Sequence, residues 1–221
     1  EIYQCDWSSD VCSSDLRGMS DRYRTIGNGG ESLLREKGSR FIGIAFHAAA
    51  ESDAREGIAR IAKQHHASRH ICFAYVLGPG MELQRVNDAG EPAGTAGAPI
   101  LRAIQQAGLT CIAVVVVRYF GGTLLGKGGL IRAYGEAARD AIAGSTVKEE
   151  VIRAAVSFRC PLARVDWLKQ ELRRMDGMLT ESSFGDDCNG VAMLPRGAAH
   201  EAIARWGAHG IIASLSGEEG S

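Results

Sequence analysis

One stretch, residues 110–145, constrains the fold of this chain more than any other. It begins with seven consecutive apolar residues, 111–117, four of which are valine. This run is too short to cross a membrane. Its β-branched content is typical of a central strand that is covered on both faces. A glycine-rich crossing follows, and we expect an apolar-periodic helix to start near Leu130.

The crossing contains five glycines within nine positions, at 121, 122, 126, 128 and 129. Glycine loses much backbone entropy on folding, so this cluster indicates positive φ angles or a very close approach. Residues 121–127 nearly match the G-x-x-x-x-G-K loop of nucleoside triphosphatases. However, Gly128 stands where that motif needs Ser or Thr to ligate magnesium, and no apolar strand ending in Asp follows. We therefore reject a triphosphatase site.

Two interpretations of the glycine crossing stay open. Glycine amides and a helix N-terminus attract anions, and Arg118, Lys127 and Arg132 would add positive charge. Alternatively, the crossing is a tight connection whose glycines only permit backbone packing.

Residues 5–16, CDWSSDVCSSDL, resemble a translated sequencing-library adapter. We expect the native chain to begin at Met19, and we exclude residues 1–18 from reasoning about the fold. The remainder carries 24 basic and 22 acidic residues. Because this balance is nearly neutral, any contact with nucleic acid must use a local patch.

The remaining chain, about 200 residues, is long enough for two modest domains. We expect an α+β fold with a first domain at 19–146 and a second at 150–217. In the first we predict an arm with a short extended piece at 21–37, strands at 39–48, 69–77, 81–86 and 111–117, and helices at 51–66, 100–106 and from 130. In the second, strand 151–160, helix 162–175, a hairpin of 178–184 and 189–194, helix 198–206 and strand 210–216 give the ferredoxin-like β-α-β-β-α-β order.

Four cysteines outside the adapter-like segment stand alone, without a CxxC motif or a Cys/His pair of metal-binding spacing. Reduced, buried thiols are typical of a cytoplasmic protein. We see no signal peptide and no long apolar span, so we predict a cytoplasmic location and no membrane partner. We predict no cofactor and no metal site.

The loop at 87–99 carries two carboxylates three residues apart, Asp88 and Glu91. Paired carboxylates can bind a cation or act as acid and base, but such residues also cap turns. Thr95 is open to the same two interpretations, as a site hydroxyl or a turn residue. His70, at the start of a predicted strand, is a further candidate for the site.

These segments resemble the IMPACT/YigZ family. The resemblance rests on NDAGEPAGTAGAPIL at 87–101 and VVVVRYFGGTLLGKGGLIRAYGEA at 114–137, with KGSRFI at 37–42 and RHICFAYV at 69–76. It covers positions 23 to about 215. Together with the residue analysis above, it gives these candidate ligand-binding residues: His70, Asp88, Glu91, Thr95, Arg118, Tyr119, Gly121, Gly122, Lys127, Gly128, Arg132 and Tyr134.

The resemblance implies two-layer α/β domains. The first is similar to the second domain of a small-subunit ribosomal protein and to domain IV of elongation factor G. It is expected to have a left-handed βαβ crossover, against the usual right-handed rule. The second is similar to the ferredoxin-like domain V of elongation factor G.

The resemblance favours a non-enzymatic regulator of translation that binds RNA, the ribosome or a translation-linked protein. One alternative is an enzyme that acts on a phosphate-bearing small molecule between the Asp88/Glu91 loop and the glycine loop. Another is a pure protein-interaction module, as the eukaryotic members imply. The deciding observation is whether His70, the two carboxylates and Arg118 meet on an exposed concave face or are buried and paired.

Overall fold

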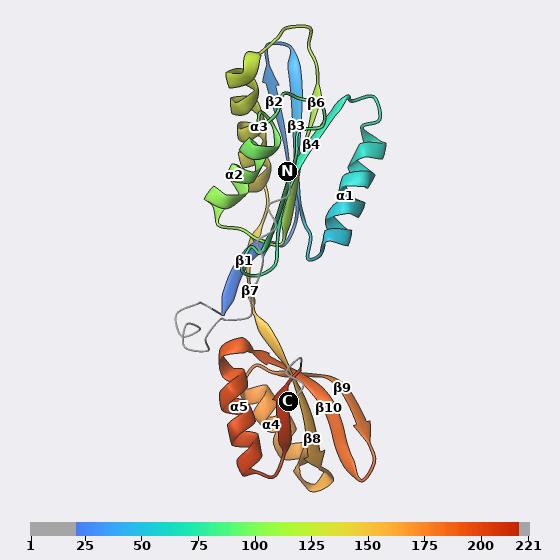
Figure 1. Cartoon of the computed structure of the whole chain (residues 1–221), viewed down its shortest axis with the longest axis vertical. Helices are drawn as coiled ribbons and strands as arrows, with labels where there is room; N and C mark the ends of the chain where they lie inside the picture. Colours follow the sequence, from blue (N-terminus) through green and yellow to red (C-terminus); the bar gives the residue numbers. More distant parts are fainter. Residues whose placement is uncertain (1–20, 217–221) are drawn as a thin grey trace. The chain divides into compact units, whose positions relative to one another are not determined.

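The computed structural model describes residues 21–216, so the adapter-like segment and the proposed start at Met19 lie outside the described residues. The described chain forms two compact units, one spanning Arg22–Ile152 and the other beginning at Arg153. Each unit combines helices with antiparallel sheet, which confirms the α+β class (Figure 1). No helix between residues 21 and 216 is long and apolar enough to cross a membrane.

The first unit is built on a five-stranded sheet with β6 at its centre. In spatial order the strands are β2 (Gly30–Glu36), β3 (Ser39–His47), β6 (Ile112–Tyr119), β4 (His70–Leu77) and β5 (Leu83–Asn87). All neighbouring strands are antiparallel. Every residue of β6 before Tyr119 is buried, as the valine run predicts.

Helices cover both faces of this sheet (Figure 1). Helices α2 (Gly97–Ala107) and α3 (Gly126–Ala143) pack on the face of Val114 and Val116. Helix α1 (Glu51–Gln64) packs on the face of Val115. This double coverage explains why an antiparallel strand carries the unbroken apolar run that is more usual in parallel sheets. The first unit therefore has three layers where the resemblance implies two. The left-handed sense of the β3–α1–β4 crossover stays a prediction.

The prediction of an arm with one short extended piece at 21–37 falls short, because this segment contains two strands, β1 (Arg22–Ile26) and β2. β1 pairs with β7 (Val147–Val151), far away in the sequence, so its local pattern gives little signal. In β2 both faces mix polar and apolar residues. Ser32 faces α3 and donates a hydrogen bond to the carbonyl of Ala137, whereas Leu33 is exposed.

Two helices begin earlier than their sequences predict. α2 starts at Gly97 instead of residue 100, because the side chain of Asp88 accepts hydrogen bonds from the backbone N–H groups of its start. α3 starts at Gly126 instead of near Leu130. Leu130 joins the buried core and Leu125 packs against that core, which offsets the weak helix propensity of the glycines between them.

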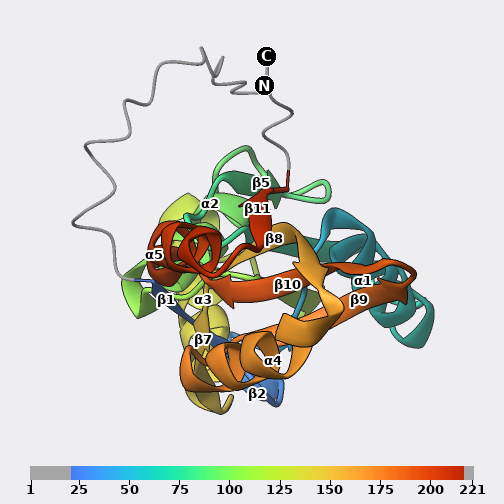
Figure 2. The same ribbon diagram turned by 90° about the horizontal axis from the view of Figure 1, so that it is seen from below.

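The second unit has the predicted β-α-β-β-α-β order. Its elements are β8 (Arg153–Pro161), a short 3-10 turn η2 (Leu162–Arg164), α4 (Val165–Arg174), β9 (Met178–Phe184), β10 (Asp187–Pro195), α5 (Arg196–Ala208) and β11 (Ile212–Leu215). The strand order is β11-β8-β10-β9 (Figure 2). Phe158, Leu168 and Trp206 join the sheet and the two helices in one buried core, so this unit has two layers.

Gly43 of β3 sets how closely α3 approaches the sheet, because a Cβ atom there would overlap the backbone oxygen of Ala137. We predict that Gly43→Ala lowers the free energy of unfolding of the first unit by about 1–3 kcal/mol. Gly128→Ala in α3 is the control. A Cβ at Gly128 has no heavy atom within 4 Å, so this change should be neutral or stabilise by up to about 1 kcal/mol.

Hydrogen exchange of the β6 amides measures the stability of the first unit in both variants. Tryptophan fluorescence would not, because the described tryptophans, Trp167 and Trp206, lie in the second unit. Equal exchange in the two variants would contradict the close contact between β3 and α3.

Candidate functional site

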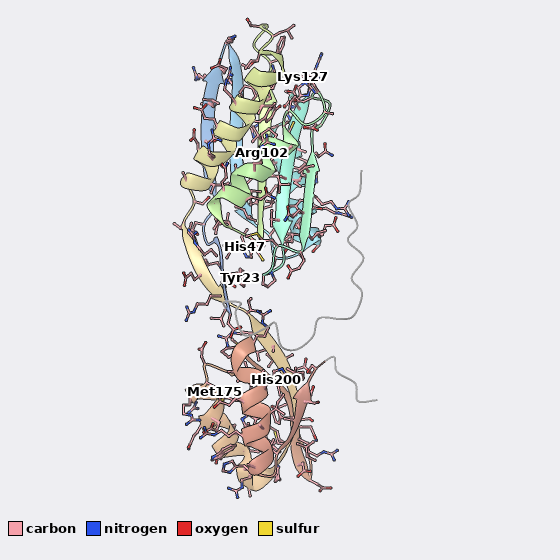
Figure 3. The ribbon with its side chains drawn as sticks, turned by 60° about the vertical axis from the view of Figure 1, so that its left-hand side comes forward. Tyr23, His47, Arg102, Lys127, Met175 and His200 are labelled. Carbon is pink, nitrogen blue, oxygen red and sulfur yellow. The ribbon has the colours of Figure 1, made fainter. Side chains whose placement is uncertain are left out.

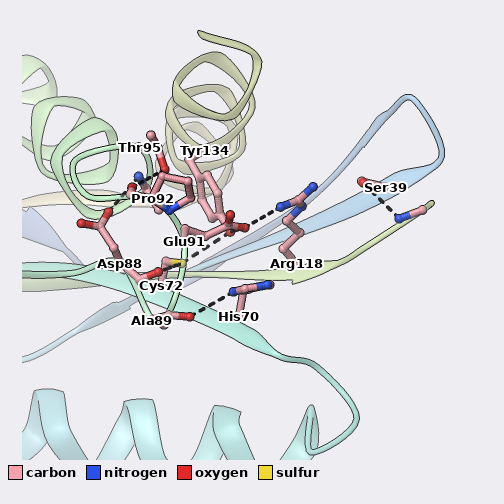
Figure 4. Close-up of polar contacts among 12 residues, drawn as sticks. Ser39, His70, Cys72, Asp88, Ala89, Glu91, Pro92, Thr95, Arg118 and Tyr134 are labelled. Atoms are coloured by element: carbon pink, nitrogen blue, oxygen red, sulfur yellow. Dashed lines mark hydrogen bonds and ion pairs between the residues drawn. The ribbon is translucent and has the colours of Figure 1, made fainter. Parts of the chain in front are cut away.

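A buried ion pair joins the 88–95 loop to the end of the central strand. Nη1 of Arg118 lies 2.7 Å from Oε1 of Glu91, and the two side chains are only 6% and 4% exposed. The hydroxyl of Tyr134 on α3 donates to the same carboxylate oxygen at 2.8 Å (Figure 4). Charges this deeply buried persist only when paired. The interaction therefore holds loop, strand and helix together.

Two neutral hydrogen-bond donors, Cys72 and Tyr134, complete this cluster. The thiol of Cys72 on β4 donates to the carbonyl of Asp88 at 3.0 Å and lies 3.4 Å from the hydroxyl of Tyr134. Desolvation raises the pKa of Cys72 to about 12. Desolvation also raises the pKa of Tyr134 far above its usual value. Both groups stay protonated at neutral pH, so the charges of this cluster belong to Glu91 and Arg118.

Asp88 caps helix α2. Its Oδ1 accepts hydrogen bonds from the N–H groups of Ala96 and Gly97, and its Oδ2 accepts one from Gly94, each at 2.9 Å. Desolvation alone would raise the pKa of Asp88, but these three donors outweigh it and lower the pKa below its usual value. Thr95 is buried, and its hydroxyl donates to the carbonyl of Pro92 at 2.6 Å, as in a turn residue.

His70 lies directly opposite Arg118 in the pairing of β4 with β6. Its Nδ1 is 3.0 Å from the carbonyl oxygen of Ala89. A carbonyl can only accept a hydrogen bond, so Nδ1 carries the proton. The fold thus brings His70, Asp88, Glu91 and Arg118 to the same end of the sheet. Both carboxylates are already engaged within the fold, and this favours their structural interpretation.

The glycine crossing meets the turn between β2 and β3. A Cβ at Gly121 would overlap the backbone of Gly38, and the N–H of Gly121 donates to Oγ of Ser39 at 3.1 Å. Gly122 and Gly126 have φ angles of 88° and 71°, which only glycine adopts readily. These three glycines are required by the backbone. Gly128 is not, because the space above it is open.

Four exposed cations surround this crossing, and we call them the cationic end: Lys37, Arg40, Lys127 and Arg132. Within residues 21–216 none of the four forms an ion pair. The guanidinium of Arg40 lies 4.9 Å from the ring centre of Tyr119. The first turn of α3 has no side-chain cap and no acidic residue. Lys127 lies at the opposite end of the unit from Tyr23 and His47 (Figure 3).

The candidate residues from the sequence therefore separate into two groups. Thr95, Arg118 and Tyr134 are buried, whereas Gly121, Gly122, Lys127, Gly128 and Arg132 are exposed and Tyr119 is half-buried. Sequence reasoning missed Lys37, Arg40 and Phe120 as site residues. The Lys37-Gly38 turn was a usable signal for the hairpin, but its contact with the crossing is long-range. In the described part of the chain no three His, Cys, Asp or Glu side chains are grouped to hold a metal.

The ion pair predicts strong thermodynamic coupling. Arg118→Met leaves the carboxylate of Glu91 buried without a counter-charge, so the first unit should lose about 3–5 kcal/mol of stability. The double variant Arg118→Met/Glu91→Gln should lose less than the sum of the two single changes, with a coupling above about 1 kcal/mol. Urea unfolding followed by hydrogen exchange of β6 measures this cycle, and additive effects would contradict the pairing.

The Asp88 cap of α2 predicts that the stability of the first unit depends on pH. Asp88→Ala should cost about 0.5–2 kcal/mol at neutral pH. A carboxyl whose pKa is lower in the folded state stabilises the fold above its unfolded pKa, and this contribution is lost as the pH falls through the folded pKa. The difference between wild type and Asp88→Ala should therefore be complete above about pH 4 and shrink below it. Asp140→Ala, at an exposed carboxylate of α3, is the control and should change the stability at neutral pH by no more than about 0.5 kcal/mol.

The model of the Impact N-terminal domain matches residues 37–142. The IMPACT family member YvyE of Bacillus subtilis is 36% identical over 169 residues, which cover 76% of this chain and 78% of that protein. The IMPACT family member YigZ of Escherichia coli is 34% identical over 150 residues, covering 67% and 74%.

A solved structure described as "Crystal structure of an hypothetical protein" superposes with a TM-score of 0.72 at 27% identity. The superposition covers 91% of the present chain and the whole of the chain in the solved structure. The sequence matches extend over the buried ion pair, the capped loop and the glycine crossing alike. On this evidence the chain belongs to the IMPACT family.

Proposed function

We propose that this protein binds RNA, free or within the ribosome, through the cationic end. The supporting observation is the grouping of Lys37, Arg40, Lys127 and Arg132 around the uncapped start of α3. Unpaired cations and free backbone N–H groups are what a phosphate backbone requires. The whole chain has a formal net charge of only −1, so a localised patch has to supply the attraction.

The internal pairing of Glu91 preserves the positive potential of the cationic end. Its carboxylate is compensated by Arg118, so it does not cancel the exposed cations. The open space above Gly128 also lets a ligand approach the first turn of α3 closely. A role in regulating translation and a cytoplasmic location belong to the same proposal.

The geometry favours binding over acid–base chemistry at the 88–95 loop. Asp88 is held by three backbone donors, and Glu91 by Arg118 and Tyr134. A general acid or base must be within reach of a substrate proton and free to exchange its own. These two carboxylates instead hold the 88–95 loop to α2, β6 and α3.

The proposal predicts a salt-sensitive interaction that depends on particular cations. Lys127→Ala and Arg132→Ala should each weaken binding of a fluorescent RNA oligonucleotide. Each should also reduce the slope of log K against log salt by about 0.7, since one phosphate contact is lost. Fluorescence anisotropy over a series of KCl concentrations measures both quantities.

Arg102→Ala is the matched control, because Arg102 is an exposed cation on α2 away from the cationic end (Figure 3). It should leave affinity and slope unchanged. Wild-type protein that shows no salt-sensitive RNA binding, or an Arg102 variant as weak as the Lys127 variant, would contradict the proposal.

A further inference from the structure

A pocket of about 440 Å³ opens where β6 ends. Ser68, Arg69 and His70 line one side, and Arg118 and Phe120 line the other. This volume lies within the usual range for small-molecule and nucleotide sites. No acidic side chain lines the pocket. The pocket thus combines polar and apolar lining, and within the described residues Arg69 is its unpaired cation.

Arg118 has unused hydrogen-bonding capacity in this wall. Its Nη1 pairs with Glu91, but within the described residues its buried Nε has no hydrogen-bond partner. The residue is only 6% exposed. Buried donors are almost always satisfied, so an unpartnered one in a pocket wall points to a ligand that brings an acceptor or reorients the guanidinium.

The other wall is held rigidly. Oγ of Ser68 donates to the carbonyls of Arg118 and His70, at 2.9 and 3.1 Å. The ring of His70 is fixed by the contact of its Nδ1 with Ala89. Arg69 beside it is exposed and forms no ion pair within residues 21–216. A preformed wall of this kind lowers the entropy lost when a ligand binds.

Phe120 adds an aromatic surface. Its side chain is 55% exposed, and the guanidinium carbon of Arg118 lies 5.4 Å from its ring centre. Exposed aromatic rings and guanidinium planes are the groups on which proteins stack unpaired bases. A base within a duplex is already stacked between its neighbours and offers no free face.

We infer that this pocket takes one unpaired nucleotide, with its base on Phe120, its phosphate beside Arg69, and Nε of Arg118 as a hydrogen-bond donor. The protein then prefers single-stranded to double-stranded RNA. This inference rests on the proposed function and names the form of RNA that the cationic end receives.

The test compares a labelled RNA strand alone with the same strand annealed to its complement, at one salt concentration. The single strand should bind wild type more tightly. Phe120→Ala should weaken single-strand binding roughly five- to hundredfold and leave duplex binding unchanged. Phe120→Trp should restore single-strand binding. Leu124→Ala is the matched control, because Leu124 is an aliphatic residue of the same crossing and is 83% exposed.

A strand that contains 2-aminopurine gives a second readout. Its fluorescence should be quenched on binding to wild type and to Phe120→Trp but not on binding to Phe120→Ala, since stacking quenches this base. Equal affinity for both forms of RNA, or a Phe120→Ala variant that binds the single strand like wild type, would overturn the inference. Salt-sensitive binding through Lys127 and Arg132 would then still stand. If neither form of RNA binds wild type, the proposed function fails as well.

Discussion

The buried pair of Glu91 and Arg118 is the interaction on which the rest of the first unit depends. Separating two opposite charges in an apolar setting is costly, so the pair has one stable arrangement. Tyr134 adds α3 to this arrangement through the same carboxylate oxygen. The loop that carries Glu91 is in turn closed by Asp88, which starts α2. Strand, loop and both helices of one face are thus joined through two carboxylates of one loop, Glu91 and Asp88.

This arrangement separates residues that build the site from residues that can meet a ligand. Because Glu91 and Arg118 neutralise each other, the electrostatic field at this end of the sheet comes from exposed cations. The backbone contact between Gly38 and Gly121 places the β2–β3 hairpin beside the crossing, so cations from distant segments share one surface. These contacts therefore place exposed cations from two segments, Lys37 and Arg40 on one and Lys127 and Arg132 on the other, at one end of the sheet.

The elements that could be predicted are those with strong local patterns. The valine run identified β6, and periodicity with turn residues identified every helix and strand of the second unit, because those signals are short-range. β1 was missed because it is stabilised by β7, which lies more than a hundred residues away. β2 was missed because Ser32 faces inward and Leu33 outward. The early start of α2 depends on a cap from a distant residue, and the early start of α3 depends on core packing. Helix propensity, which is a property of each residue type, includes neither effect.

The sequence by itself determined the family, the α+β class, the order of most elements and some of the polar residues around the glycine crossing, among them Lys127 and Arg132. Only the tertiary structure decided which of those residues are buried. Glu91 and Arg118 are 27 positions apart, and local spacing does not reveal that they pair. Nor does it reveal that Lys37 and Arg40 join Lys127 and Arg132. Burial and pairing arise from contacts between distant segments, and those contacts exist only once the sheet has formed.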